Sequence, residues 1–111
     1  VPNELRLCLN GGRFAVEASW LDFDGNSGVG AVRPISSDTG AFWFFDSENL
    51  EVLVKVLDGR ALNGAFWVFY GAISNVEYEL VVTDSETGEI RRYRNPKGSF
   101  ASRGDTSAFP Q

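Results

Sequence analysis

Apolar and polar side chains alternate with a period of two in two segments of the chain. In residues 14–20 the positions on one side are Phe14, Val16, Ala18 and Trp20. In residues 76–83 they are Val76, Tyr78, Leu80 and Val82, with Glu77 and Glu79 on the opposite side. Successive side chains of a β-strand point to opposite faces, so this period is typical of a strand with one buried face. Both segments are predicted to be half-buried strands.

Aromatic residues gather in two short runs that do not alternate. Residues 42–45 and 66–70 together contain eight aromatic rings. Large apolar side chains on both sides of a strand are typical of strands covered on both faces, or of a crowded interface. The sequence therefore favours a double-layered β core that takes in all eight rings. The alternative is that one side of each run is covered by a partner or a ligand.

Residues 46–59, between the two runs, are ambiguous because their polar start also suits a helical turn. Val52, Val54 and Val56 stand at alternate positions, so we predict a turn over residues 46–49 and then a strand. Turn signals divide the rest of the chain at residues 10–12, 63–64, 85–88 and 95–98. The predicted fold is all-β: a single antiparallel β-sandwich domain over residues 1–111, with about seven to nine short strands. An up-and-down barrel is the fallback.

Composition limits the function classes. The 111 residues carry a net charge of −5, and the basic cluster at residues 91–94 is offset by Glu86 and Glu89, so no nucleic-acid partner is expected. No apolar run approaches the roughly 20 residues of a membrane-spanning helix, so no membrane insertion is expected. The absence of Met indicates a processed form or a domain cut from a longer protein. The single cysteine, Cys8, is expected to be a small buried hydrophobe.

Several motifs, among them Phe42-Trp43-Phe44-Phe45-Asp46, occur together along the chain. They lie in residues 7–9, 12–14, 38–46, 54–60, 63–64, 66–72, 83–88, 93–96 and 102–106. With these motifs the sequence resembles, over nearly its whole length, an all-β module that recurs in secreted and surface proteins of environmental bacteria. The resemblance implies an extracellular or cell-surface location and a non-catalytic accessory role. No activity is established for such modules, so the resemblance assigns no functional residues.

Oxygen-bearing side chains alternate around a glycine turn in residues 22–28. Asp22, Asp24 and Asn26 are spaced as in calcium-binding loops, which makes them candidate metal ligands and calcium the implied cofactor. An EF-hand loop would place a bidentate Glu at its twelfth position, where this chain has Arg33. The alternative is a polar connection between two strands whose side chains bond to nearby backbone.

Aromatic side chains outside the core are the candidate binding groups. Trp43, Trp67 and Tyr93 are assigned to a ligand or partner, and Trp20 is a further candidate for stacking on sugar rings. Near the C-terminus, the tripeptide at residues 103–105 is expected to form a turn rather than an integrin-type motif.

The chain offers few groups for acid–base or nucleophilic catalysis. It contains no His, and therefore no Ser/His or Cys/His pair. The aspartates that could form a carboxylate dyad stand beside Gly, Ser or Thr, as turn aspartates do; they are Asp38, Asp46, Asp58 and Asp84. No catalytic residue is assigned, and enzymatic activity is not expected.

Three function classes remain. The first is a non-catalytic extracellular interaction or structural module that assembles through strand edges, such as residues 5–9, with a protein partner or copies of itself. The second is a carbohydrate-binding accessory module of a secreted enzyme, with a polysaccharide as partner. The third is a protease-inhibitor-like binder that presents residues 33–36, although the chain lacks the disulfides that stiffen small inhibitor loops.

Overall fold

The computed structural model describes residues 5–73, 75–98 and 102–111, which form ten β-strands and one short helix. The first sheet contains β1 (Leu7–Leu9), β2 (Phe14–Leu21), β3 (Ser27–Val29), β8 (Glu77–Asp84) and β9 (Ile90–Asn95). The second sheet contains β4 (Ala31–Pro34), β5 (Thr39–Trp43), β6 (Leu50–Gly59), β7 (Ala65–Ala72) and β10 (Ser102–Pro110). The helix α1 (Arg60–Asn63) is a single turn between β6 and β7.

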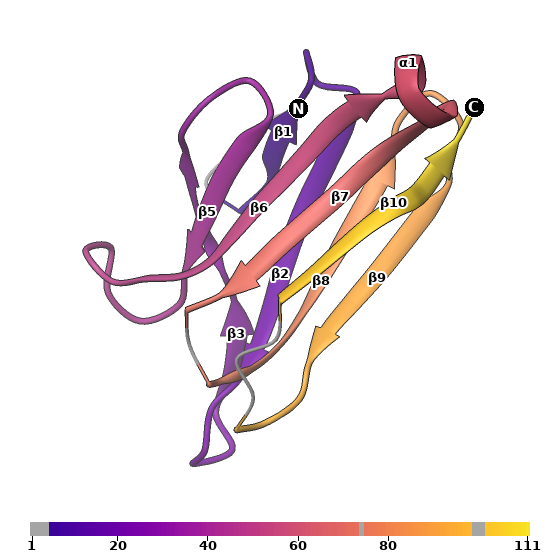
Figure 1. The fold of residues 1–111 in the computed structure, drawn as a ribbon. Helices are drawn as coiled ribbons and strands as arrows, with labels where there is room; N and C mark the ends of the chain where they lie inside the picture. The colour runs from indigo at the N-terminus through magenta and orange to yellow at the C-terminus, as the bar shows by residue number, and fades with distance from the viewer. Residues whose placement is uncertain (1–4, 74, 99–101) are drawn as a thin grey trace.

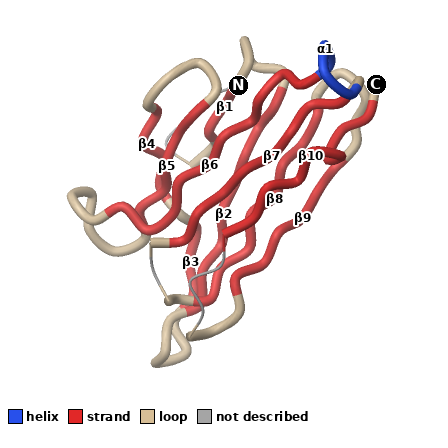
Figure 2. The backbone as a smooth tube through the Cα atoms, viewed as in Figure 1, coloured by secondary structure: helices blue, strands red, loops and turns tan. Residues whose placement is uncertain are grey.

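The two sheets lie face to face as two layers (Figures 1 and 2). The first has the order β1-β2-β8-β9, with β3 paired to the far end of β2, and the second has the order β10-β7-β6-β5-β4. All pairs are antiparallel, and the sheets do not close into a barrel. The predicted all-β sandwich is confirmed, and the barrel is excluded. Strands are more numerous than predicted, because the short β3 and β4 lie where the sequence shows no alternation.

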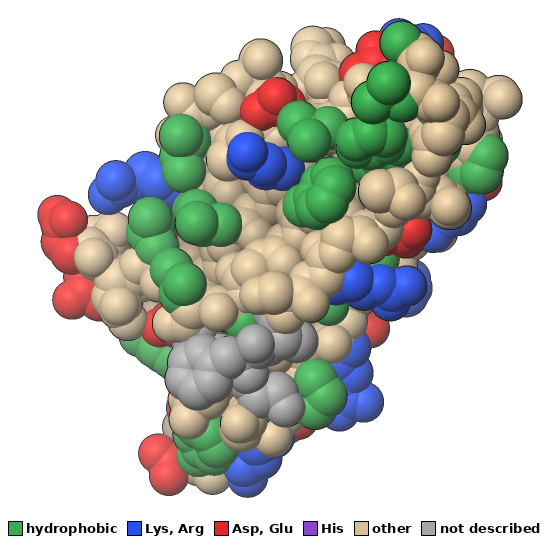
Figure 3. All heavy atoms as spheres, in the orientation of Figure 1, with side chains coloured by type: hydrophobic (Ala, Val, Ile, Leu, Met, Phe, Trp, Pro, Cys, Tyr) green, Lys and Arg blue, Asp and Glu red, His purple; other side chains and the backbone are tan. Residues whose placement is uncertain are grey.

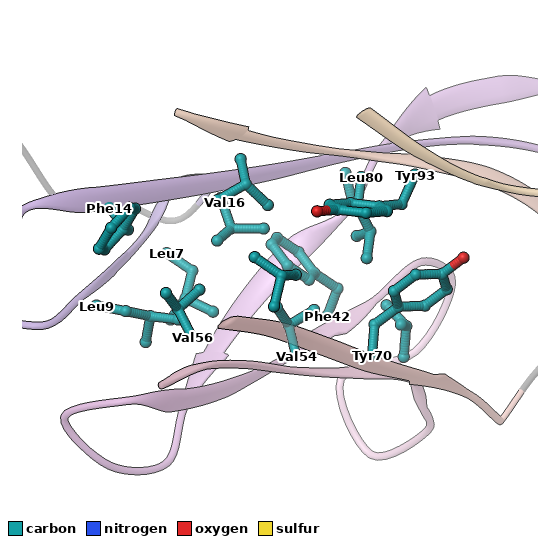
Figure 4. Close-up of a cluster of buried hydrophobic side chains, with 14 of the residues drawn as sticks. Leu7, Leu9, Phe14, Val16, Phe42, Val54, Val56, Tyr70, Leu80 and Tyr93 are labelled. Carbon is teal, nitrogen blue, oxygen red and sulfur yellow. The ribbon is translucent and has the colours of Figure 1, made fainter. Parts of the chain in front are cut away.

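The core fills the space between the layers with inward side chains from both sheets (Figure 4). Val52, Val54 and Val56 of β6 are each 0% exposed, which confirms the strand predicted from their spacing. The inward sets predicted for residues 14–20 and 76–83 also face the core, although Trp20 is only partly buried. Full burial of a Val, Leu or Phe side chain contributes about 1.5–3 kcal/mol, so this layer is the main source of stability.

The two aromatic runs alternate between the core and the outer side, which corrects the prediction that all eight rings are buried. Four rings lie in the core, at most 8% exposed: Phe42, Phe44, Phe66 and Tyr70. Trp43, Trp67 and Phe69 are half-buried, and Phe45 is 50% exposed. The period of two was hidden in the sequence because apolar rings occupy both sides of β5 and β7.

Turn chemistry was predicted well, with one correction. Asn10, Gly11 and Gly12 all have positive φ, as a tight β1–β2 hairpin requires. The turn signal at residues 63–64 ends a helical turn, because residues 61–62 belong to α1 rather than to a strand. Gly64 ends this helical turn in the left-handed region, with φ 76°, and its N–H donates to the Arg60 carbonyl at 3.0 Å. The connection still joins antiparallel neighbours, β6 and β7.

Two further expectations are wrong. The tripeptide at residues 103–105 is not a turn, because it lies in β10 and pairs with residues 68–70 of β7. Cys8 is only half-buried, because it points away from Leu7 and Leu9, which face the core. The turn predicted over residues 46–49 is confirmed by the Asn49 N–H, which donates to the Asp46 carbonyl at 2.9 Å.

Candidate ligand-binding face

The outer side of the second sheet carries the aromatic rings that β5 and β7 direct away from the core. We call this surface the aromatic face; its members are Trp43, Leu53, Lys55, Leu57, Trp67 and Phe69. Figure 3 views the molecule in the orientation of Figure 1, and hydrophobic side chains gather over β5, β6 and β7 around a basic one. The face is therefore apolar but not uncharged.

Strand pairing sets the layout of this face. Lys55 lies opposite Phe69, and Leu57 lies opposite Trp67. Such directly opposed side chains have Cβ atoms about 4.5–5.5 Å apart. Trp43 pairs with Leu50 of β6, and Trp67 pairs with Leu57 of the same strand, so the two partners are seven residues apart. With about 3.3 Å per residue and 4.8 Å between strands, Trp43 and Trp67 are about 25 Å apart. The aromatic face is thus an elongated strip rather than a compact pocket.

Trp67 lies against the backbone of the neighbouring strand. A Cβ at Gly59 would meet three of its ring atoms, Cε2, Nε1 and Cδ2, at 2.1–2.7 Å, so the indole covers this glycine. The indole N–H donates to the Asn63 side-chain oxygen at 2.8 Å. This bond uses the only polar group of the indole and fixes the ring in place. What remains for a ligand is the half-exposed ring surface.

Phe69 stands beside Trp67 at a steep angle. Their ring centroids are 6.3 Å apart and their planes make an angle of 72°. One edge of the Phe69 ring passes over Gly104 of β10, where a Cβ would meet Cε1 at 2.6 Å and Cδ1 at 2.8 Å. The two rings therefore form a corner in which the edge of one ring meets the other, and each ring also covers a glycine of a neighbouring strand.

Two basic side chains accompany the rings. Lys55 is exposed on β6, and Arg33 is exposed on β4 in the row that runs through Ala41 and Leu53. The ion pairs of the described residues include neither of them. Arg33 donates a hydrogen bond to the carbonyl of Ser47 at 3.3 Å, which leaves its charge uncompensated.

Trp43 occupies the other end of the strip. It is the last residue of β5 and pairs with Ala31 of the edge strand β4, just beyond a register shift between Phe42 and Trp43. Beside it is an apolar hollow of about 490 Å³, lined by Leu5, Val29, Ala31, Val32, Trp43 and Phe44. Trp43 and Trp67, both assigned to binding from the sequence, therefore share one face but lie at opposite ends of it.

The outer side of the first sheet has different chemistry. We call it the charged face; its ionised members are Glu17, Glu77, Glu79, Arg92 and Arg94. Arg92 pairs with Glu79 at 3.2 Å, and Arg94 pairs with Glu77 at 2.5 Å. A shallow hollow of about 580 Å³ on this side is lined partly by both glutamates. Its charges are compensated within the chain.

Tyr93 does not lie on either outer face. It is 3% exposed inside the sandwich, packs 5.5 Å from Tyr70, and donates its hydroxyl hydrogen to Asp105 Oδ2 at 2.7 Å. Burial, and then the hydrogen bond to Asp105, raise the pKa of Tyr93 far above its usual value. A buried ring offers no face for stacking, so the binding role predicted for Tyr93 is corrected.

Trp20 also points inward. Its ring lies 6.2 Å from Phe44 in a stacked arrangement and 4.7 Å from Phe45. Its indole nitrogen is buried without a hydrogen-bond partner among the described residues. Trp20 therefore closes one end of the core and contributes nothing to the aromatic face.

The proposed calcium ligands lie in the turn between β2 and β3. Asp22 Oδ1 accepts the backbone N–H groups of Asp24 and Asn26 at 3.0 and 2.8 Å, and the Asn26 amide donates to Oδ2 at 3.2 Å. Burial alone would raise the pKa of Asp22, but these hydrogen bonds outweigh it and lower the pKa. This geometry matches the alternative, a turn held by its own aspartate. In the part of the chain that is described, no three acidic, His or Cys side chains cluster as metal ligands.

A polar cluster at one end of the sandwich joins distant parts of the chain. Asp84 is 0% exposed, and Arg13 donates two hydrogen bonds to it, each 3.0 Å long. Arg13 also donates to the Gln111 side chain at 2.6 Å. The hydrogen bond from Arg13 lowers the pKa of Asp84, and the one from Arg60 lowers that of Asp58 to about 2. This arrangement is a clamp between the β1–β2 turn, the β8–β9 turn and the C-terminus.

The remaining aspartates have local partners, as turn aspartates do. Asp38 accepts hydrogen bonds from the hydroxyls of Thr39 and Ser36 at 2.7 and 3.2 Å. Asp46 accepts the backbone N–H of Glu48 at 2.9 Å. Among the four aspartates considered as a dyad, each is bonded to its own neighbours or to an arginine.

Four members of the aromatic face were not assigned from the sequence: Leu53, Lys55, Leu57 and Phe69. Of these, only Phe69 belonged to a feature singled out in the sequence, the aromatic run at residues 66–70. The sequence contained the information needed for β6. Val52, Val54 and Val56 define its inward side, so the residues between and after them, Leu53, Lys55 and Leu57, point outward. The glycines beneath the rings, Gly59 and Gly104, gave no signal, because their role appears only once strands pair.

No family model, curated protein or solved structure matches this chain. No helix in the described ranges is long and apolar enough to cross a membrane. Function must therefore be inferred from the geometry of the chain's own side chains.

Proposed function

We propose that the chain is a non-catalytic binding module that holds a polysaccharide along its aromatic face. An extracellular or cell-surface location, as the sequence resemblance implies, is part of this proposal. The observation that carries it is the corner formed by Trp67 and Phe69, with Trp67 fixed on Gly59 by its bond to Asn63. A pyranose ring has an apolar C–H side that packs on the electron-rich face of an aromatic ring.

The shape of the aromatic face supports a polymer rather than a small ligand. Trp43 and Trp67 lie about 25 Å apart along β6 by strand geometry, with Leu53 and Leu57 between them. Small-molecule sites are concave and bury most of their ligand. An open strip with rings at both ends suits an extended chain that makes several weak contacts, each adding to the next.

Assembly through strand edges, the first class inferred from the sequence, receives less support. Natural proteins protect sheet edges with short strands, proline, bulges and charges. Here β1 and β3 have three residues each, β4 ends at Pro34, and β10 contains a register shift before Pro110. The edge strand β9 carries three arginines within residues 90–95. Each edge therefore has a feature that opposes pairing with another chain.

A protease-inhibitor role has no specific observation in its favour. Residues 33–36 lie where β4 turns into β5, and the backbone N–H groups of Ile35 and Ser36 both donate to the Thr39 carbonyl. This segment is a tight hairpin turn rather than an extended loop that a protease cleft would accept.

Binding to a panel of soluble polysaccharides, neutral and acidic, tests the proposal. We expect at least one polymer to retard the protein in affinity electrophoresis. The Trp67→Ala variant should then bind about tenfold more weakly, which corresponds to a loss of about 1.4 kcal/mol. The control is Val81→Ala, which removes an apolar outward side chain from the charged face. Failure of every polymer to bind, or unchanged binding by Trp67→Ala, would contradict the proposal.

A further inference from the structure

We propose that the polysaccharide is anionic, and that Lys55 and Arg33 bind its carboxylate or sulfate groups. This inference rests on the proposed function and assigns the charge of the ligand. It begins from the distribution of basic residues in a chain of net charge −5. Most are matched by acids: Arg6, Arg13, Arg60, Arg91, Arg92 and Arg94 all form ion pairs. Among the described residues, the basic side chains outside ion pairs are Arg33, Lys55, Lys97 and Arg103.

Two of these four point outward from the second sheet. Arg103 turns instead toward the core, where its guanidinium lies 5.5 Å from the Tyr93 ring centroid. Lys97 lies 5.2 Å from the Phe23 ring, outside both sheets. Lys55, on the aromatic face, and Arg33, beside it, are therefore the two outward cations of the second sheet that form no ion pair with a described residue.

The outward strand positions around them carry few acids; Asp38 lies near Lys55, and the exposed Asp46 and Glu48 flank Ser47, whose carbonyl Arg33 contacts. Among the described residues of β4, β5, β6, β7 and β10, the outward positions contain one carboxylate, Glu51. It is 5% exposed and accepts a hydrogen bond from the Asn49 amide at 2.8 Å. Asp38, at the margin of the face, has a pKa lowered first by its bond from Thr39 and in small part by the charge of Lys55. The two side chains are more than 4 Å apart.

The position of Lys55 makes its charge effective toward a ligand. It lies between Phe69 and Thr39 in its row, with Leu53 and Leu57 on either side along β6. Apolar neighbours displace water, so a charge there is screened less than one on a fully wet surface. An anionic group beside a sugar stacked on Phe69 or Trp67 would be within reach of this ammonium.

Lys55 and Arg33 are spaced for two groups on one polymer. They lie two strands apart with an offset of two residues, since Thr39 pairs with Lys55 and Ala41 pairs with Arg33. Strand geometry places their backbones about 12 Å apart. A polymer that carries a charge on successive or alternate sugars would meet both cations while its rings follow the strip.

The test compares polymers that share a sugar backbone and differ in whether their substituents are charged. The probes are polygalacturonate, its fully methyl-esterified form, carboxymethylcellulose and hydroxyethylcellulose. We expect the wild-type chain to bind an acidic polymer at least tenfold more tightly than its neutral counterpart, with affinity that falls as salt rises. Lys55→Gln and Arg33→Gln should each weaken this binding about tenfold and reduce its salt dependence.

The control is Arg92→Gln, which removes one charge from the charged face and should leave the affinity unchanged. Equal binding of neutral and acidic forms, lost in Trp67→Ala, would overturn this inference and leave the proposed function standing. No binding to any polymer would overturn both. If light scattering showed a dimer that Trp67→Ala dissociates, the occupant would be a second copy, and both would fail.

Discussion

The two outer faces of the sandwich are built from the same element type and carry opposite chemistry. On the charged face, Arg92 and Arg94 reach Glu79 and Glu77, and the ion pairs close within the chain. On the aromatic face, Trp67 and Phe69 cover glycines of neighbouring strands, and Lys55 has no acidic partner within 4 Å among the described residues. The ionic groups of the charged face thus pair with one another, whereas the aromatic face exposes aromatic rings and a lysine outside such pairs.

This contrast bears on stability as well as on binding. Exposed ion pairs contribute little to folding, and apolar rings on an outer face gain far less than rings in the core. Neither face is therefore needed to hold the sheets together, because the buried layer between them does so. Substitutions on either face should separate binding from folding.

The largest difference in the free energy of unfolding is expected between substitutions at two adjacent residues of β7. Phe66→Ala opens the core beside Phe14, 4.8 Å away, and should lower the free energy of unfolding by about 3–5 kcal/mol. Trp67→Ala removes a ring from the outer side and should cost only about 1 kcal/mol. Urea unfolding of both variants measures the difference. Similar losses would mean that the aromatic face is part of the folding core.

Alkaline titration tests whether all three tyrosines are buried. If they are, the aromatic rings of the aromatic face are those of Trp and Phe alone. Burial is the main cause that raises the pKa of all three tyrosines of the chain, Tyr70, Tyr78 and Tyr93. A raised pKa in the folded state favours the neutral phenol. The stability it gives is therefore complete below the unfolded value of about 10, and is lost as pH rises through the folded value.

We expect little phenolate absorbance at 295 nm while the protein stays folded near pH 10. Absorbance should then rise together with loss of the circular dichroism of the β-sheets. A guanidinium-unfolded sample provides the control, with normal titration of all three groups. If one third of the signal titrated normally in the folded protein, one tyrosine would belong to a surface.

The smallest effect is expected on the charged face. Arg94→Ala removes the ion pair between Arg94 and Glu77. The Arg94 side chain is 64% exposed and the Glu77 side chain is 22% exposed. The free energy of unfolding should fall by less than about 1 kcal/mol, and the difference should vanish in high salt. Arg94→Lys keeps the charge and is the matched control. A loss well above this, insensitive to salt, would mean that the charged face is not simply a solvated surface.

The sandwich itself was predictable, since it follows from alternation and turn chemistry. In residues 14–20 and 76–83 the alternation of apolar and polar side chains identifies the inward positions. The spacing of Val52, Val54 and Val56 does the same for β6. The short β3 and β4 were missed because their positions are fixed by pairing with β2 and β5 rather than by their own pattern. The helical turn α1 was missed because an Asn-Gly pair suits both a hairpin and a helix end.

The candidate face was only partly predictable. Trp43 and Trp67 were assigned from their type, but nothing in the sequence separated them from Tyr93, which lies in the core. Burial of an aromatic ring depends on which side of its strand meets the opposite sheet, and that is a tertiary property. The isolation of Lys55 from acids likewise depends on which strands lie beside β6.

The glycines beneath the rings constrain how the sequence can vary. Gly59 has an ordinary negative φ of −97°, so its backbone would accept any residue, and only the indole of Trp67 requires glycine there. Positions 59 and 67 should therefore change together among relatives of this chain. A relative with a larger residue at position 59 should have lost the tryptophan at position 67, and with it one end of the strip. Covariation of this pair would trace which relatives kept the aromatic face.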